Sequence, residues 1–334
     1  MSKEKTVYIQ KKNGIKDRLS RIFLLLAFIV IVLLFQIVQP RFLMINNIMN
    51  LLATSSIVGV LSLGNMLLMA AGEMSFSIGA QCTVVAAIFG RFLYSPESNN
   101  MFLAFLLAVA ASILFGLVLS FFTVKVGVPT FVCTLALATI FDGMTQIFNN
   151  GTTLHSNDWP DMMNFMQTKV GGVVPIAVIT FFLLAIITDI VYERTRFGRH
   201  LYAVGSNPTA ANNVGISVPK MRIAAFVISN VYFGFAGMIA VSYNNTVTIT
   251  LGNDLMVPAI AATMLSATFL QIGKYNVPGV VLGAVLMVVI QNGVISAGYP
   301  VYIKDIIQGI MLTIAVALIA IIKEDGLPSV KLDS

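Results

Sequence analysis

The chain has 334 residues, of which 57% are hydrophobic and only 10% are charged. Soluble domains carry about 25% charged residues, so this composition excludes a soluble globular protein and indicates an integral membrane protein. The net charge of +6 does not indicate a nucleic-acid partner, because the basic residues fall in the loops on one side of the membrane topology described below.

Ten apolar runs are long enough for membrane-spanning helices, each of which needs about 20 apolar residues. The first run, over residues 22–39, follows a basic arm over residues 1–21 and lacks the cleavage pattern of a removable signal, so we expect it to be retained. The sequence therefore predicts an all-α integral membrane protein. It has one transmembrane domain over residues 22–322 and a tail over 323–334. The other nine expected spans cover residues 47–71, 76–92, 101–122, 130–148, 172–191, 222–242, 256–272, 277–296 and 303–322.

An even number of spans places both termini on the same side of the membrane. All but four of the 20 lysines and arginines fall on that side, the exceptions being Arg41, Arg91, Lys169 and Lys304. The positive-inside rule identifies this side, and with it the N- and C-termini, as cytoplasmic. Residues 71–75 are too few for a normal loop and the eighth span is short, so we expect broken or re-entrant backbone at these places, buried in protein or facing a water-filled cavity.

Motifs for chemistry are absent from the sequence. It contains no phosphate-binding loop of the Gly-x-x-x-x-Gly-Lys-Ser/Thr type, so we expect no ATP hydrolysis by this chain. Cys82 and Cys133 lie in apolar runs and match neither a disulfide framework nor a metal site. Neither paired intramembrane aspartates nor a Ser-His or His-x-x-x-His arrangement occurs. We therefore expect no catalytic residue, no metal site and no cofactor on this chain.

The longest internal cytoplasmic segment, residues 193–222, carries the signals of a short surface helix. Asn207 can cap the helix, Pro208 suits its first position, and Gly215 can close it in a left-handed conformation. Basic residues precede it at Arg194, Arg196 and Arg199. A rigid helix of this kind can dock into a partner protein. The alternative is an ordinary solvated basic loop.

The run RFGRHLYAVGSNPTAANNVGI, residues 196–216, resembles the cytoplasmic coupling loop of certain permease subunits. These subunits belong to bacterial ABC importers of the ribose, xylose and galactose type, in the branched-chain amino acid and monosaccharide permease superfamily. Residues 128–135 (VPTFVCTL) resemble the start of a central span in that family, and residues 279–284 with 291–293 (QNG) resemble its late Gly-x-x-x-Gly-Ala and Asn-Gly pattern. The resemblance extends over most of the chain.

This resemblance implies that residues 207–215 form a coupling helix seated in a cleft of a cytoplasmic ABC ATPase, which would hold ATP and Mg. It also implies a second permease copy or paralogue, an extracytoplasmic solute-binding protein, and a place among the lipids of the bacterial inner (plasma) membrane. The residues expected to contact or position the ATPase are Arg196, Phe197, Gly198, Arg199, Asn207, Pro208, Ala210, Ala211 and Gly215.

The chain departs from the family pattern after the second span. The family carries Gly-Gly-Ile-Asp-Leu-Ser-Val-Gly-Ser there, whereas residues 71–80 read AGEMSFSIGA. Ser75 stands in the place of the usual Asp, and an acid appears two residues earlier at Glu73. A lone carboxylate at this depth marks a transport pathway, a proton site or a paired structural charge, unless it lies hydrated at the cytoplasmic interface. A second departure places Asp142 where the family often has Arg. These differences leave the solute open, and with it the choice between a homodimer and a heterodimer.

Polar side chains at central depth should face a cavity or another helix. Neutral amides with aromatic faces suit a neutral sugar, although each residue has an alternative role in holding helices together. The candidate translocation residues are Asn65, Glu73, Ser75, Gln81, Asp142, Gln146, Gln291 and Asn292, with Tyr232 at the same depth.

The leading hypothesis is an ATP-driven importer subunit for a monosaccharide or related small polar solute. The alternative is a proton- or ion-coupled secondary transporter that uses Glu73 and Asp142 as coupling carboxylates. No clear inverted repeat occurs in the sequence, which disfavours the second hypothesis.

Overall fold

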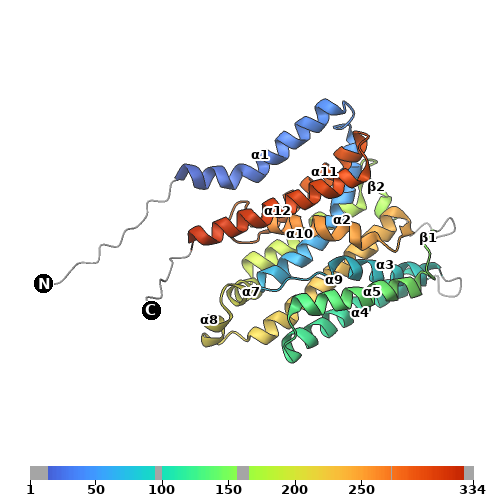
Figure 1. Cartoon of the computed structure of the whole chain (residues 1–334). Coiled ribbons are helices and arrows are strands. Elements are labelled where there is room, and N and C mark those ends of the chain that lie inside the picture. The colour runs from blue at the N-terminus through green and yellow to red at the C-terminus, as the bar shows by residue number, and fades with distance from the viewer. Residues whose placement is uncertain (1–13, 95–99, 156–164, 272, 327–334) are drawn as a thin grey trace.

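The computed structural model describes residues 14–94, 100–155, 165–271 and 273–326 (Figure 1). The first 13 residues of the basic arm and residues 327–334 of the tail lie outside this description. Ten apolar helices of the described residues overlap the ten expected spans in order along the chain. They are α1 (Gly14–Val38), α2 (Ile45–Ala70), α3 (Ile78–Tyr94), α4 (Met101–Ser120), α5 (Thr130–Phe148), α6 (Ile176–Asp189), α9 (Val218–Asn244), α10 (Leu251–Ser266), α11 (Val277–Ser296) and α12 (Val301–Gly326).

Short elements lie at the two ends of this bundle. A π-helical turn, η1 (Phe121–Val126), extends α4, and another, η3 (Ile190–Arg194), extends α6. Two further helices, α7 (Arg196–Ser206) and α8 (Pro208–Asn213), lie at the same end as the start of α1 and the end of α12 (Figure 1). At the opposite end, β1 (Leu154–His155) pairs antiparallel with β4 (Thr246–Val247), and β2 (Lys169–Val170) with β3 (Val174–Pro175).

By length and composition, six helical segments of the described residues can cross a membrane, and Phe28–Val38 and Ile78–Leu93 are shorter apolar helices. The helices α2, α9 and α11 form the core, with 89%, 67% and 61% of their most apolar windows buried. The corresponding fractions are 33% for α4 with η1, 28% for α5 and 33% for α6 with η3. These outer helices expose large apolar side chains such as Phe102, Ile147 and Leu183, as expected of surfaces that face lipid.

Small residues allow close contact between helices in the core. Gly79 at the start of α3 lies against Gly252 at the start of α10, and a Cβ placed on Gly252 would lie 1.8 Å from the Gly79 carbonyl oxygen. The Gly252 amide also donates a hydrogen bond to the Thr83 hydroxyl at 2.7 Å. Because lipid tails are as apolar as the helices, contacts of this kind supply packing that the hydrophobic effect does not.

The connection between α2 and α3 is non-helical over residues 71–77, which confirms the expected break there. The expected span over residues 256–272 was wrong at both ends, because α10 begins at Leu251 and ends at Ser266. The Asn276 side chain donates hydrogen bonds to the carbonyls of Ser266 and Phe269, both at 2.7 Å. It also accepts one from the Gly279 amide at 2.9 Å. This side chain closes the turn after α10 and caps α11, so residues 267–276 form a connection instead of a further helical turn.

The contact between α3 and α10 yields a stability prediction. Gly252→Ala should lower the free energy of unfolding by about 1–3 kcal/mol, because the new methyl group forces the two backbones apart. The measurement is the melting temperature of the detergent-purified protein. Gly309→Ala on α12 is the matched control, since no neighbouring atom lies within 4 Å of a Cβ there. Equal melting temperatures for the two variants would contradict this account of the contact.

Candidate functional site

The helix α8 has the local structure that its sequence indicates. The Asn207 side chain accepts a hydrogen bond from the Ala210 amide at 2.9 Å, and Pro208 occupies the first turn. Gly215 has a φ of +85°, and the Ile216 amide donates to the Ala211 carbonyl at 3.0 Å. Both ends of this short helix are therefore closed. Its side chains are exposed except for Ala211, so α8 projects from the bundle.

The helix α7 was missed by the sequence analysis, which treated its residues as a basic loop. Phe197, Leu201 and Val204 recur at helical spacing and mark an amphipathic helix, and the last two are fully buried. A Cβ on Gly205 would lie 2.1 Å from the Ala70 carbonyl, and one on Gly198 would lie 1.8 Å from the Tyr192 carbonyl. The helix α7 is thus seated directly on the end of α2 and on η3, whereas Arg196 and Arg199 remain exposed.

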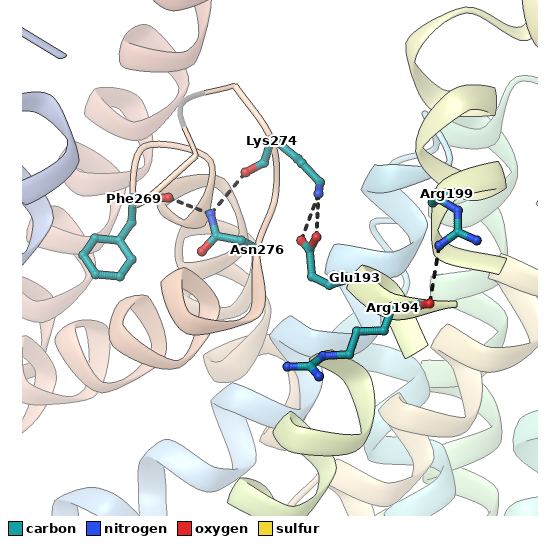
Figure 2. Close-up of polar contacts among 6 residues, drawn as sticks. All are labelled: Glu193, Arg194, Arg199, Phe269, Lys274 and Asn276. Atoms are coloured by element: carbon teal, nitrogen blue, oxygen red, sulfur yellow. Dashed lines mark hydrogen bonds and ion pairs between the residues drawn. The ribbon is translucent and has the colours of Figure 1, made fainter. Parts of the chain in front are cut away.

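An ion pair ties the beginning of this segment to the connection between α10 and α11 (Figure 2). The Lys274 ammonium lies 2.9 and 2.8 Å from the two carboxylate oxygens of Glu193. It also lies 5.5 Å from the ring centroid of Tyr192 and 5.6 Å from that of Tyr202, within range of cation–π attraction. Burial raises the pKa of the neighbouring phenol of Tyr275, so this group stays uncharged near neutral pH.

A second ion pair holds Glu73, the acid that departs from the family pattern. The Arg222 guanidinium lies 3.0 Å from a Glu73 carboxylate oxygen, and the Glu73 side chain is only 11% exposed. The Thr130 hydroxyl, at the first position of α5, donates a hydrogen bond to the same carboxylate. A cavity of about 510 Å³ adjoins the pair, lined by residues of the α2–α3 connection, of η1 and of the start of α9. Glu73 is therefore a paired charge at the end of the bundle where α7 lies.

Two other candidate translocation residues lie deep in the bundle. Asn65 on α2 and Gln81 on α3 are fully buried. Neither amide atom of Gln81 has a hydrogen-bond partner among the described residues, nor does the Asn65 carbonyl oxygen. Leaving such a group unpaired costs about 1–3 kcal/mol. Unpaired buried polar groups in native proteins call for a specific explanation, and a functional role is one of them.

The buried residues Ser229 and Asn230 on α9 share this property but were not among the expected residues. The Ser229 hydroxyl and the Asn230 carbonyl oxygen are also unpaired within the described residues. Their signal in the sequence was an adjacent polar pair inside the apolar run over residues 222–242. The same rule that selected Asn65 and Gln81, a polar side chain at central depth, would have found them.

The remaining candidates lie apart from the buried group. Asp142 is half-buried and Gln146 is exposed, one turn apart on the outer helix α5. Gln291 and Asn292 are half-buried on α11, where Asn292 accepts a hydrogen bond from Ser296 at 2.9 Å.

Ser75 is buried in the α2–α3 connection, and its hydroxyl lies 3.0 Å from that of Ser77. The Tyr232 and Thr188 hydroxyls lie 2.7 Å apart. Hydrogen bonds between the described residues do not join the candidates into one site.

Comparison with known proteins identifies the family. Residues 47–316 match the family model described as the permease component of the branched-chain amino acid transport system. This range covers well over half of the chain and includes all the expected coupling and translocation residues. This match shows the family that residues 196–216 resemble.

Individual relatives match over nearly the whole chain. The ribose import permease protein RbsC of Escherichia coli K12 is 26% identical over 294 residues, covering 87% of this chain and 91% of the relative. The galactose/methyl galactoside import permease protein MglC of the same strain is 28% identical, covering 89% and 92%. The autoinducer 2 import system permease protein LsrD of Enterobacter sp. 638 is 28% identical, covering 88% and 90%.

The cap of α8 can be tested directly. Asn207→Ala removes the acceptor for the Ala210 amide and should destabilise this helix by about 1 kcal/mol, or about fivefold faster local amide exchange. The measurement is hydrogen exchange of the peptide that contains Ala210. Asn207→Asp keeps the acceptor oxygen and should exchange at the wild-type rate. Equally fast exchange in both variants would show that the side chain does not hold the helix.

Proposed function

We propose that this chain, which belongs to the family of branched-chain amino acid transport system permease components, is the membrane-spanning subunit of an ATP-driven importer. The observation that carries the proposal is α8, a helix closed at both ends, exposed, and mounted on a helix that contacts the spans. A docking element needs this combination, because force applied to a frayed helix or a loose loop would not reach the bundle. The alternative of a solvated basic loop predicts neither the caps nor the seat on α2.

The chain is a multi-pass protein of the bacterial inner membrane. Within the proposal it has about ten spans with both termini in the cytoplasm. The ten apolar helices of the described residues support this count. The side is supported by Figure 1, where α7 and α8 lie at the same end as the start of α1 and the end of α12. Positive charge around α7 favours the cytoplasm for that end.

The proposed partners follow from the division of ATP hydrolysis, solute delivery and membrane passage among different proteins. A cytoplasmic ABC ATPase would hold ATP and Mg and receive α8, and an extracytoplasmic solute-binding protein would deliver the solute at the opposite end. The chain itself would perform no covalent chemistry. The contacts expected on this chain are the exposed residues of α7 and α8, while the buried Gly198 and Ala211 would position them.

The outer helix α5 supports a second permease copy or a paralogue as a further partner. Thr139, Asp142 and Gln146 lie on one side of this helix, and Thr139 and Gln146 are exposed. An acid and an amide facing hydrocarbon would be costly, so such residues normally face protein or a water-filled cavity. A second permease against this face would bring Asp142 and Gln146 into the interior of the assembly.

The solute that we propose is a monosaccharide or a related small polar molecule. The unpaired carbonyl oxygens of Asn65 and Asn230, both amide atoms of Gln81 and the hydroxyl of Ser229 offer neutral donors and acceptors on α2, α3 and α9. These are the groups that hydrogen-bond sugar hydroxyls, and they carry no fixed charge that would select an ion. The relatives named above import ribose, galactose or methyl galactoside, and autoinducer 2, so the proposal does not extend to one solute.

The docking role of α8 can be tested by purification and uptake. Replacing residues 208–213 with a Gly-Ser linker should abolish recovery of an ATPase with the tagged chain and abolish solute uptake. The variant should still insert in the membrane, because only one side chain of α8 is buried. The measurements are mass spectrometry of co-purified proteins and uptake into cells. Normal uptake by this variant would refute the importer proposal.

The alternative, a proton- or ion-coupled secondary transporter, predicts a different energy source for uptake. In proteoliposomes that contain this chain, its ATPase and its binding protein, uptake should require ATP and should be unchanged by a protonophore. The Asp142→Asn variant should likewise show no dependence on the gradient, because Asp142 would not carry a transported proton. Uptake that continues without ATP but stops with the protonophore would transfer the assignment to the secondary transporter, with Glu73 and Asp142 as its coupling carboxylates.

A further inference from the structure

The two ends of the coupling segment, residues 193–222, are each held by an ion pair. At the first residue, Glu193 pairs with Lys274 in the connection between α10 and α11. At the last, Arg222 pairs with Glu73 in the connection between α2 and α3. The two partners lie far apart in the sequence and belong to different helical hairpins. The segment between the pairs contains α7 and α8.

The Lys274 side of the first pair is firmly anchored. The Asn276 side-chain amide donates to the Lys274 carbonyl at 3.2 Å and to the Phe269 carbonyl at 2.7 Å (Figure 2). It also donates to the carbonyl of Ser266, the last residue of α10, at 2.7 Å. Tyr192 and Tyr202 present their rings to the Lys274 ammonium from η3 and α7. A movement at the start of α7 would therefore act on the Lys274 ammonium, which belongs to the α10–α11 connection.

The Glu73 side of the second pair joins three helices. The Glu73 amide donates to the Leu68 carbonyl at 3.1 Å, and Gly72, with a φ of +82°, allows this turn at the end of α2. The Glu73 carboxylate meets Arg222 on the first turns of α9 and the hydroxyl of Thr130 at the start of α5. One carboxylate thus links the end of α2, the start of α9 and the start of α5.

We propose that these two ion pairs are the positioning contacts that carry movement of α8 into two separate parts of the bundle. The helix α8 buries a single side chain, Ala211, so its own contacts with the spans are few. Its displacement reaches them through α7 and the two ends of the segment. The Glu193 pair directs movement to α10 and α11, and the Arg222 pair directs it to α2 and α5. This inference rests on the proposed function, because it assumes that an ATPase moves α8.

The test uses the complete transporter in proteoliposomes and measures both ATP hydrolysis and solute uptake. Glu73→Gln and Lys274→Gln should leave the ATPase bound and hydrolysing, but the solute moved per ATP should fall at least about fivefold, the lower range of typical coupling between sites. The double variant E73R/R222E restores opposite charges and should recover most of the loss. Lys274→Arg keeps both the ion pair and the cation–ring contacts, so it should also recover.

Lys220→Gln is the matched control, since Lys220 is an exposed cation two residues from Arg222 with no ion-pair partner in the described residues. It should keep the transport ratio within about twofold of wild type, because such charges contribute little. Unchanged solute per ATP in Glu73→Gln and Lys274→Gln, with wild-type uptake driven by ATP, would overturn this inference alone. So would a ratio that E73R/R222E fails to restore at wild-type melting temperature. Wild-type uptake without an ATPase would overturn the proposed function and this inference together.

Discussion

Backbone hydrogen bonding in hydrocarbon constrains this structure more than any other interaction. Without water, each amide and carbonyl within the bilayer must find its partner inside the protein, and the long helices satisfy this requirement along their whole length. Among the described residues, non-helical backbone is found between the helices, as in the connections over residues 71–77 and 267–276. In both of these connections side chains supply hydrogen bonds that the helices do not. In the first, the Ser75 hydroxyl accepts from the Ser77 amide and lies beside the Ser77 hydroxyl. In the second, the Asn276 amide donates to the Ser266 carbonyl. The two ion pairs of the coupling segment have their partners, Glu73 and Lys274, in these same two connections.

The distribution of polar groups follows from the same constraint. Two acids at the α7 end of the bundle are paired with cations, Glu73 with Arg222 and Glu193 with Lys274. In the centre of the bundle the polar groups are neutral, and several remain unpaired. Under the proposed function, this arrangement suits a polar uncharged solute, since fixed charge at the centre would trap counter-ions and unpaired polar groups can exchange partners with a moving solute. The proposal places the energy source apart from the pathway, at the end where α8 projects.

Local signals in the sequence predicted a large part of the fold. Apolar length predicted ten spans, and six helical segments of the described residues are long and apolar enough to cross a membrane. The Asn207, Pro208 and Gly215 pattern predicted α8 with both of its ends, because helix caps depend on neighbouring residues only. The end of α10 was wrong because apolar length does not register the Asn276 side chain, which stops the helix from ten residues away. The helix α7 was missed because Arg196 and Arg199 at its start gave the segment the character of a basic loop.

The candidate site was less predictable than the fold. The residues of α8 are contiguous, so a local motif located them. Glu73 could be flagged as unusual, but its partner Arg222 lies on another span, and pairing between distant residues depends on how the helices pack. The amides Asn65 and Gln81 were found by depth alone, which says nothing of whether they are paired. Ser229 and Asn230 also lie at central depth, and the same criterion applied to their apolar run would have selected them.

The contact between Gly79 and Gly252 limits how the bundle can change shape. Backbone meets backbone there, and the Thr83 hydroxyl accepts a hydrogen bond from the Gly252 amide, so α3 and α10 have little room to move against each other at this contact. These two helices are therefore expected to travel as one rigid body. Any opening and closing of the protein has to hinge elsewhere, at the flexible joints of the chain or at surfaces such as that of α5, where side chains can slide past one another.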